Sequence, residues 1–351
     1  MKKRFAVLPG DGFGVDVTRV ALTALAAAAA AERIELETRS FDYGAERFLA
    51  TGETLPDGAL EELAAYDGIF MGAFGDPRVP DMRHARDILL GTRFRLDLFI
   101  NLRPIRCLHD RLCPLRGYSA RDIDFVVFRE NTEGLYVGMG GIFKKGTPDE
   151  IAIQEDVNTR KGVERIVRAA FDYARDHERS SVTMSDKSNA LRYGHDIWQR
   201  VFAEVAADYP GIEARHLYVD ALAMQLVKNP SQFDVIVTCN MFGDIVTDLG
   251  AQLQGGLGVA ASGNLHPGRT SMFEPVHGSA PKYAGTDRAN PLAAILTAAM
   301  MLEHTGAAAA GSRIERAVEE CLAAGECPAD VGGKLGTAAT GDAVARRIER
   351  G

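Results

Sequence analysis

The chain has 351 residues, and its 40 lysines and arginines against 48 aspartates and glutamates give a formal net charge of −8. This acidic balance argues against broad contact with nucleic acid or an anionic membrane surface, because clustered Lys and Arg bind both. At roughly 100–200 residues per domain, the length predicts two domains, each able to bury its own core without disulfides or metals as staples.

The chain carries no predicted export or membrane segment. No apolar run approaches the roughly 20 residues that span a bilayer, and the N-terminus reaches Pro9 and Gly10 too early for a signal peptide. The cysteines are few, odd in number and without a Cys-x-x-Cys spacing, so we expect free thiols. They are Cys107, Cys113, Cys239, Cys321 and Cys327. We therefore expect a cytoplasmic protein.

Short apolar runs alternate with helical patterns, which is typical of an α/β fold with a mostly parallel sheet covered by helices. The first predicted strand, 5–10, turns at GDGFG into a helix over 15–30. Further strands are expected at 67–75, 122–131, 181–188, 214–220 and 233–240, and helices at 161–177, 195–209, 221–229, 291–306 and 314–325. Most of these strands end in small or polar residues, where α/β proteins bind ligands. The Gly-rich stretch 255–264 is a candidate crossing between the two domains.

Three arginines lie in separate segments: Arg93 in TRFRLDLF, Arg103 in NLRPI and Arg129 in VFREN. Any one of them alone could be a surface or structural residue. Arg129 ends the apolar run IDFVVF, where a charge is costly unless it faces a partner or a ligand. Because the planar guanidinium suits a carboxylate, three converging arginines would form a site for a small polycarboxylate.

Asp244 and Asp248 are four residues apart on a predicted helix, so both carboxylates lie on one face. Such a pair fits a solvated face, or a divalent cation between the two groups. Asp220, at the end of the strand LYVD, would supply a third oxygen ligand for Mg²⁺ or Mn²⁺. Lys187 in SDKSN and Tyr136 in NTEGLY are each a possible proton donor or base, and equally a packing or surface residue.

Two loops are candidates for binding a phosphate or ribose. GDGFG (10–14) is not Gly-x-Gly-x-x-Gly, so the evidence for a Rossmann fingerprint is weak. In EPVHGSAPKYAG (274–285), mostly small residues allow close approach to a ligand, and Lys282 and Tyr283 add a cation and a stacking ring. An ordinary Gly/Pro surface turn is the alternative.

Eight motifs follow one another along the chain, and each occurs once: LPGDGFG, RFRLDLFINLRP, FVVFRENTEGLYVG, SDKSN, FDVIVTCNMFGDIVTDL, GGLGVAASGN, FEPVHGSAPKYAG and PADVGG. With them the sequence resembles the metal-dependent β-decarboxylating dehydrogenases of (R)-hydroxyacids, the isocitrate/isopropylmalate dehydrogenase family. The resemblance implies an isopropylmalate dehydrogenase-like fold, distinct from the Rossmann fold, with two lobes around a central, mostly parallel sheet. A large cofactor-binding lobe would comprise 1–99 and 252–351. A small lobe, 100–251, would carry the dimer interface and the metal and substrate residues.

The resemblance also implies a homodimer. Each active site would lie in the cleft between two lobes and would be shared between the two chains. Arg93, Arg103 and Arg129 match the arginines that bind the malate carboxylates; Tyr136 and Lys187 match the acid/base pair; Asp220, Asp244 and Asp248 match the ligands of Mg²⁺ or Mn²⁺. Lys187 and Asp220 would come from the second chain. The implied reaction is NAD(P)-dependent oxidative decarboxylation of a 3-substituted (R)-malate to a 2-oxoacid and CO₂. A non-catalytic regulatory subunit is the alternative of another class, and the intact set of eight residues argues against it.

Cofactor residues implied by the resemblance are Glu274, His277, Gly278, Ser279, Ala280, Lys282, Tyr283 and Asn290. NAD-using relatives usually carry an Asp after HGSAP, whereas this chain has Lys282 followed by Tyr283, as in NADP-dependent isocitrate dehydrogenases. These enzymes also use a Tyr and an Arg near the C-terminus, and PADVGG offers neither. We expect NADP, with NAD left open.

The substrate residues do not match a single subtype. Asp87 and Leu89 replace the Ser and Asn of isocitrate enzymes, and Leu90 replaces an Arg found in homoisocitrate enzymes. Leu89 and Leu90 resemble the apolar pocket of isopropylmalate and tartrate/D-malate dehydrogenases. Arg86 stands where isopropylmalate enzymes carry Glu, so it would bind an anionic C3 substituent, as in homoisocitrate or a phosphonomethyl-malate, or face solvent.

Overall fold

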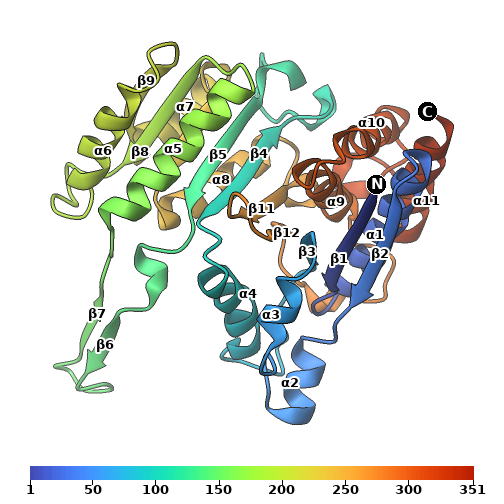
Figure 1. The fold of residues 1–351 in the computed structure, drawn as a ribbon, viewed down its shortest axis with the longest axis horizontal. Helices are drawn as coiled ribbons and strands as arrows, with labels where there is room; N and C mark the ends of the chain where they lie inside the picture. The colour runs from blue at the N-terminus through green and yellow to red at the C-terminus, as the bar shows by residue number, and fades with distance from the viewer. The chain divides into compact units, whose positions relative to one another are not determined.

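A computed structural model describes residues 1–351, which divide into two compact units. Unit 1 comprises Met1–Leu98, Arg103–Ile123 and Ala251–Gly351, and unit 2 comprises Phe99–Leu102 and Asp124–Gly250. Both chain termini lie in unit 1, where the first and last parts of the chain pack side by side (Figure 1).

One segment, Arg103–Ile123, lies in unit 1 although the expected boundaries assigned it to the small lobe. The backbone N–H of Arg106 donates to Gln254 Oε1 at 2.9 Å, and Arg111 Nη2 lies 3.1 Å from Cys327 Sγ. These contacts tie the segment to the C-terminal part of the chain. They join residues more than 140 positions apart, so no local pattern signals them.

The sheet of unit 1 runs in the order β2-β1-β3-β12-β11. Its strands are β1 (Lys2–Leu8), β2 (Glu35–Ser40), β3 (Gly68–Met71), β11 (Ala261–Leu265) and β12 (Met272–Pro275). All neighbours pair in parallel except β11 and β12, which are antiparallel. β4 (Ile100–Arg106) starts in unit 2 and ends in unit 1.

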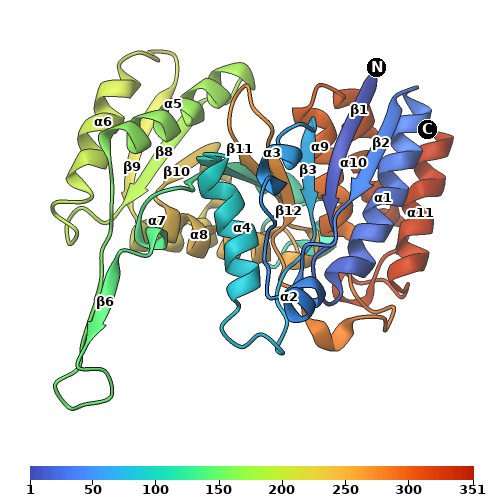
Figure 2. The same ribbon diagram turned by 60° about the horizontal axis from the view of Figure 1, so that its bottom comes forward.

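Helices bury the strands β3, β11 and β12 of the unit 1 sheet, whereas β2 at its edge is mostly exposed. Ala6 and Leu8 of β1 pack, with Leu63 and Ile88, into a cluster on the side of α2 (Ala45–Thr51), α3 (Ala59–Leu63) and α4 (Arg83–Arg95). The remaining helices of unit 1 pack against one another (Figure 2). They are α1 (Gly14–Ala31), α9 (Leu292–His304), α10 (Ala308–Ala324) and α11 (Thr337–Arg350).

α1 has the length and composition of a membrane-spanning helix, an outcome that the sequence patterns did not predict. Half of it is buried within unit 1, where it packs against α9 and α11. A core helix of a globular protein meets the same criteria, so packing accounts for its apolar character.

Unit 2 contains a parallel sheet in the order β5-β10-β8-β9. Its strands are β5 (Asp124–Glu130), β8 (Ser181–Asp186), β9 (Glu213–Tyr218) and β10 (Val235–Thr238). Its helices are α5 (Arg160–Asp176), α6 (Asp196–Ala206), α7 (Val219–Lys228) and α8 (Asn240–Leu253), the last of which ends just past the unit boundary. The predicted α/β class with mostly parallel strands is confirmed in both units.

A two-stranded antiparallel arm, β6 (Gly140–Phe143) with β7 (Ile151–Gln154), extends from the rest of unit 2 (Figures 1 and 2). The large side chains of Ile142, Phe143 and Ile153 are all more than half exposed. An isolated hairpin is only marginally stable in water, and it gains nothing from exposed apolar groups.

Gly10 is required by a close approach at the turn after β1. Its φ is +79°, and a Cβ there would lie 2.1 Å from the carbonyl oxygen of Ala73. Gly58 has nearly the same φ, +78°, with no atom within 4 Å of such a Cβ. Gly10→Ala should therefore lower the free energy of unfolding by about 3 kcal/mol or more, and Gly58→Ala by about 1 kcal/mol.

Urea unfolding of both variants tests this difference. Equal losses of stability in the two variants would show that backbone strain alone, without a clash against Ala73, explains the glycine.

Candidate functional site

The predicted site residues fall into two groups, one in each unit. Unit 1 holds Arg86, Leu89, Leu90, Arg93, Arg103, Glu274, His277, Gly278, Ser279, Ala280, Lys282, Tyr283 and Asn290. Unit 2 holds Arg129, Tyr136, Lys187, Asp220, Asp244 and Asp248.

Arg129, near the end of β5, is buried, with only 1% of the residue exposed. Its Nε and Nη2 donate to Asn240 Oδ1 at 3.0 and 2.7 Å, and its Nη1 donates to Asp244. The expectation that a charge at this position needs a partner is confirmed. Asn240 was not predicted, although its place directly behind an apolar strand is the kind of position where polar groups meet a ligand.

Tyr136 and Arg129 share the Asp244 carboxylate. The Tyr136 hydroxyl donates to Asp244 Oδ2 at 2.8 Å, and the Arg129 guanidinium carbon lies 5.2 Å from the Tyr136 ring centroid. Asp248 follows one turn later on α8, so the predicted helical spacing of the two carboxylates is confirmed. Arg129 and Tyr136 thus meet at one carboxylate of α8, and a second carboxylate lies one helical turn further along.

Gly243 makes room for the buried arginine. A Cβ at this position would lie 2.5 Å from Arg129 Cγ and 2.6 Å from its Cβ. Helix α8 can therefore cross the Arg129 side chain only where it lacks a side chain of its own.

Lys187 and Asp220 form an ion pair, with 2.8 Å between Nζ and Oδ1. Lys187 directly follows β8, as predicted, whereas Asp220 was wrongly assigned to a strand end. β9 ends at Tyr218, and Asp220 lies in the first turn of α7. The ammonium of Lys187, hydrogen-bonded to this carboxylate, holds the pKa of Asp220 below its ordinary value.

The three aspartates predicted to bind a metal are not gathered within one chain. No group of three or more His, Cys, Asp or Glu side chains in the chain is arranged to hold a metal ion. Asp244 and Asp248 share a helix face, while Asp220 is paired with Lys187 and remains 68% exposed at its side chain. Carboxylate oxygens are the ligands that Mg²⁺ and Mn²⁺ prefer, so the donor chemistry fits, with two ligands from α8 and a third from another source.

In unit 1, Arg93 lies in the last turn of α4 and is held by Glu274 of β12. Its Nη2 lies 2.6 Å from Glu274 Oε1, which also accepts from Asn264 Nδ2 at 2.9 Å. Arg93 Nε is buried without a partner, so Arg93 retains an unused donor for a ligand oxygen. The third predicted arginine, Arg103, lies in β4 and is also buried, with 6% of the residue exposed.

The remaining substrate residues also lie on α4, with different degrees of burial. Leu89 packs against the buried cluster of unit 1, and Leu90 is half-buried. The Arg86 side chain is 62% exposed, and its Nε lies 3.2 Å from Asp87 Oδ1. Arg86 thus has an exposed salt-bridge partner within its own helix.

The GDGFG turn supports the loop at 274–285. The Phe13 N–H donates to the Ser279 carbonyl at 2.9 Å, and the Phe13 and His277 rings lie 4.9 Å apart. The buried Asp11 carboxylate accepts from the N–H groups of Ala45 and Gly75 at 2.7 and 2.8 Å. The conformation of the predicted cofactor loop thus depends on the first turn of the chain.

A cavity of about 550 Å³ opens beside this loop. Its lining includes the predicted residues His277, Ala280, Tyr283 and Asn290, and four charged residues that sequence reasoning missed, Asp287, Arg288, Asp330 and Lys334. Asp330 accepts from Asn290 Nδ2 at 2.9 Å. No hydrogen bond or ion pair engages Lys334, so the cavity offers a free cation.

Burial lowers the pKa of His277 below its ordinary value and so favours the neutral ring. Its Nδ1 lies 3.2 Å from the Gly278 carbonyl oxygen, which can only accept, so Nδ1 carries the proton. Nε2 is buried and has no partner. The cavity therefore contains an unsatisfied acceptor, which fits a ligand with a hydrogen-bond donor.

Lys282 does not line the same cavity as Tyr283. It lines a smaller cavity, about 420 Å³, with Gly75, Met82 and Ser279. Its Nζ lies 4.9 Å from the Tyr283 ring centroid. Lys282 and Tyr283 thus line two adjacent cavities.

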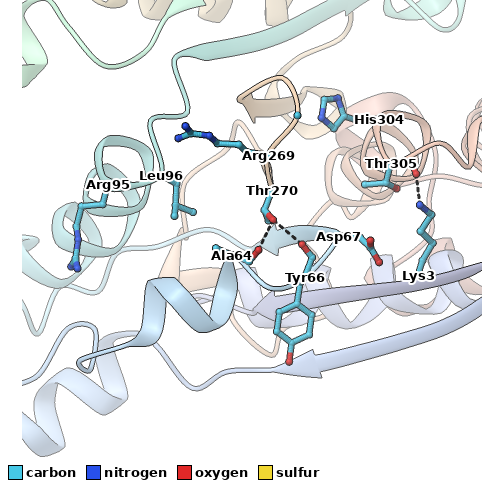
Figure 3. A pocket seen from close by; sticks show the side chains of 11 residues that line it. Lys3, Ala64, Tyr66, Asp67, Arg95, Leu96, Arg269, Thr270, His304 and Thr305 are labelled. Carbon is cyan, nitrogen blue, oxygen red and sulfur yellow. Dashed lines mark hydrogen bonds between the residues drawn. The ribbon is translucent and has the colours of Figure 1, made fainter.

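Another hollow of unit 1, about 710 Å³, contains none of the predicted site residues. Lys3 Nζ donates to the Thr305 carbonyl, and Thr270 Oγ1 lies 2.8 Å from the carbonyls of Ala64 and Tyr66. Figure 3 shows the charged ends of Lys3, Arg95 and Arg269 well apart from one another. Its cations do not converge on one ligand.

A sequence model described as isocitrate/isopropylmalate dehydrogenase matches residues 4–344. The chain belongs to this family. A 3-isopropylmalate dehydrogenase of Thermobifida fusca is 48% identical over 347 residues, which cover 98% of this chain and 97% of that protein. A 3-isopropylmalate dehydrogenase of Nocardia farcinica is 45% identical over 350 residues, which cover 98% and 100%.

Among solved structures, an isocitrate dehydrogenase from Methylococcus capsulatus superposes with a TM-score of 0.89 at 37% identity, covering 99% of both chains. The predicted family and its fold are confirmed. As a member of the isocitrate/isopropylmalate dehydrogenase family, the protein is an oxidoreductase, a decarboxylating dehydrogenase.

Proposed function

We propose that the protein catalyses NAD(P)-dependent oxidative decarboxylation of a 3-substituted (R)-malate, with 3-isopropylmalate as the first candidate. The observation that carries the proposal is the group formed by Arg129, Tyr136 and Asp244. It combines a buried cation for a carboxylate, a phenol for proton transfer and a carboxylate for a divalent ion. The 3-isopropylmalate dehydrogenases at 45–48% identity support the choice of substrate.

Three arginines bind the two carboxylates of the malate in this proposal. Arg129 is held from behind by Asn240, so its guanidinium is fixed before the substrate arrives. Arg93 is fixed in the same way by Glu274 and keeps its Nε for the substrate. Arg103 completes the set. Preorganised donors reduce the entropy lost on binding.

Asp244, Asp248 and a third carboxylate, Asp220 of a second chain, would hold Mg²⁺ or Mn²⁺. A bound nicotinamide would supply the hydride acceptor for C2, and the divalent ion would supply polarisation of the C2 oxygen. Lys187 takes the proton of the C2 hydroxyl, directly or through a water. After CO₂ leaves, Tyr136 delivers a proton to C3, oriented by its hydrogen bond to Asp244.

The C3 substituent of the substrate is apolar in this proposal. Leu90 is half-buried on α4 and is available to contact it, together with the exposed part of Leu89. Arg86 is mostly exposed and paired with Asp87, which favours its solvent-facing alternative. If Arg86 instead turns to bind an anionic C3 substituent, the alternative substrate is homoisocitrate or a phosphonomethyl-malate.

The active enzyme is a homodimer in this proposal. The exposed apolar side chains of the arm, among them Ile142, Phe143 and Ile153, support a surface that a second chain covers. Met224 on α7 and Ile245 on α8 are 67% and 60% exposed, and add apolar surface near the proposed metal ligands. A second chain would also supply the third carboxylate.

NADP is the cofactor that the cavity residues favour. Lys282 lies beside the Tyr283 ring, and Arg288 lies 6.0 Å from the same ring centroid. The unengaged Lys334 of the 550 Å³ cavity adds a further cation. The two cations beside the Tyr283 ring support the 2′-phosphate of NADP over the 2′-hydroxyl of NAD, although Asp287 and Asp330 also line the cavity.

A substrate panel tests the proposed reaction. The protein should reduce NADP or NAD with 3-isopropylmalate in the presence of Mg²⁺ or Mn²⁺, and more slowly with D-malate or tartrate. Homoisocitrate, isocitrate and a phosphonomethyl-malate complete the panel. Lys187→Met should lower kcat by at least about 100-fold, because the general base is lost. Turnover of none of the substrates, or unchanged kcat in Lys187→Met, would contradict the proposal.

Lys282→Asp tests the cofactor. The carboxylate should repel the 2′-phosphate and accept from a 2′-hydroxyl, so the NADP-to-NAD ratio of kcat/KM should fall by at least about tenfold. Lys228→Asp, a charge reversal at the end of α7 in unit 2, is the control for net charge. An unchanged ratio in Lys282→Asp would show that this residue does not contact the phosphate.

A further inference from the structure

The Lys187–Asp220 pair sits at the ends of two neighbouring parallel strands. Lys187 follows β8 and Asp220 follows β9 by two residues. Neither residue lies in a regular strand, and the Asp220 side chain is 68% exposed. Something other than the sheet must therefore fix the 2.8 Å contact between them.

Asp186, the last residue of β8, is a fully buried carboxylate with 0% exposure. Its Oδ1 accepts from His216 Nε2 at 2.9 Å and from the Ser188 N–H at 3.2 Å, and its Oδ2 accepts from Gln199 Nε2 at 2.9 Å. The partners come from β9, from the loop after Lys187 and from α6. A carboxylate this deeply buried is costly unless hydrogen bonds satisfy it.

These hydrogen bonds hold both members of the pair. Ser188 is the residue next to Lys187, and His216 lies on β9, four residues before Asp220. The Lys187 N–H also donates to His195 Nδ1 at 3.1 Å, so its backbone is fixed from a second direction. The loop with the lysine and the strand leading to the aspartate are thus tied to one carboxylate.

We infer that Asp186 is a positioning residue that holds Lys187 and Asp220 as one preformed unit for delivery to an active site. This inference rests on the proposed function. Asp186 contacts neither Lys187 Nζ nor Asp220 and acts through His216 and Ser188. Losing it would let the general base and the third metal ligand move independently.

Asp186→Asn is the direct test, with Asp234→Asn as the matched control. Asp234 Oδ2 accepts from the N–H groups of Ser180 and Ser181, both at 3.0 Å, so it ties β8 at the opposite end of the strand. Asp186→Asn should lower kcat by about 10–100-fold, the usual cost of losing an outer-shell partner. KM for the nicotinamide cofactor, whose proposed residues lie in unit 1, should change by less than about twofold. Asp234→Asn should leave kcat within about twofold.

Amide hydrogen exchange supplies a readout that does not depend on turnover. Exchange should quicken at 187–190 and at 217–221 in Asp186→Asn and stay unchanged there in Asp234→Asn. If Asp186→Asn fails to fold, His216→Ala removes one donor at a side chain that is already 28% exposed. It should produce the same exchange pattern.

Two results would overturn the inference: wild-type kcat in Asp186→Asn, or unchanged exchange in both segments. An inactive wild-type protein would contradict the proposed function instead, and the exchange measurement would still decide the role of Asp186.

Discussion

A buried arginine imposes the arrangement of the candidate site in unit 2. Arg129 has almost no contact with water, so its guanidinium must be satisfied by protein or ligand. Asn240 and Asp244 meet that need from the first turns of α8, and Gly243 lets the helix approach closely enough. A charge that is costly to bury thus sets the distance between β5 and α8. The same contact brings Tyr136 to Asp244 and leaves Asp248 one turn away.

Buried carboxylates support both groups of residues. Asp11 holds the turn behind the proposed cofactor loop, and Glu274 holds Arg93. Asp186 holds the segments that carry Lys187 and Asp220. Each is buried, and each accepts from donors on different segments of the chain. The net charge of −8 therefore does not predict the local charge of the site. There, a few carboxylates hold the cationic side chains that would bind an anionic substrate and a dinucleotide.

The sequence predicts the elements whose apolar periodicity is strong and local, such as α5 and β10, but not β2, β4, β11, β12, α2, α3, α4 or α11. It also identifies Arg129 as a residue that needs a partner. The arm was missed because its strands are short and face water, and a pattern of burial cannot signal an unburied element. Asp186 was missed although it stands next to Lys187. The role inferred for it depends on a hydrogen bond to His216, 30 residues away, which a single sequence does not reveal.

In the proposed function the active site needs two chains, since Asp220 pairs with Lys187 and no three possible metal ligands are grouped within one chain. Co-refolding Lys187→Met with Asp248→Asn tests it most directly, because a hybrid dimer would then contain one site with no substitution. Random pairing of equal amounts should restore about a quarter of the wild-type turnover, although each variant alone is inactive. Mixtures that stay as inactive as the separate variants would contradict the claim, because all of the residues would then have to act within one chain.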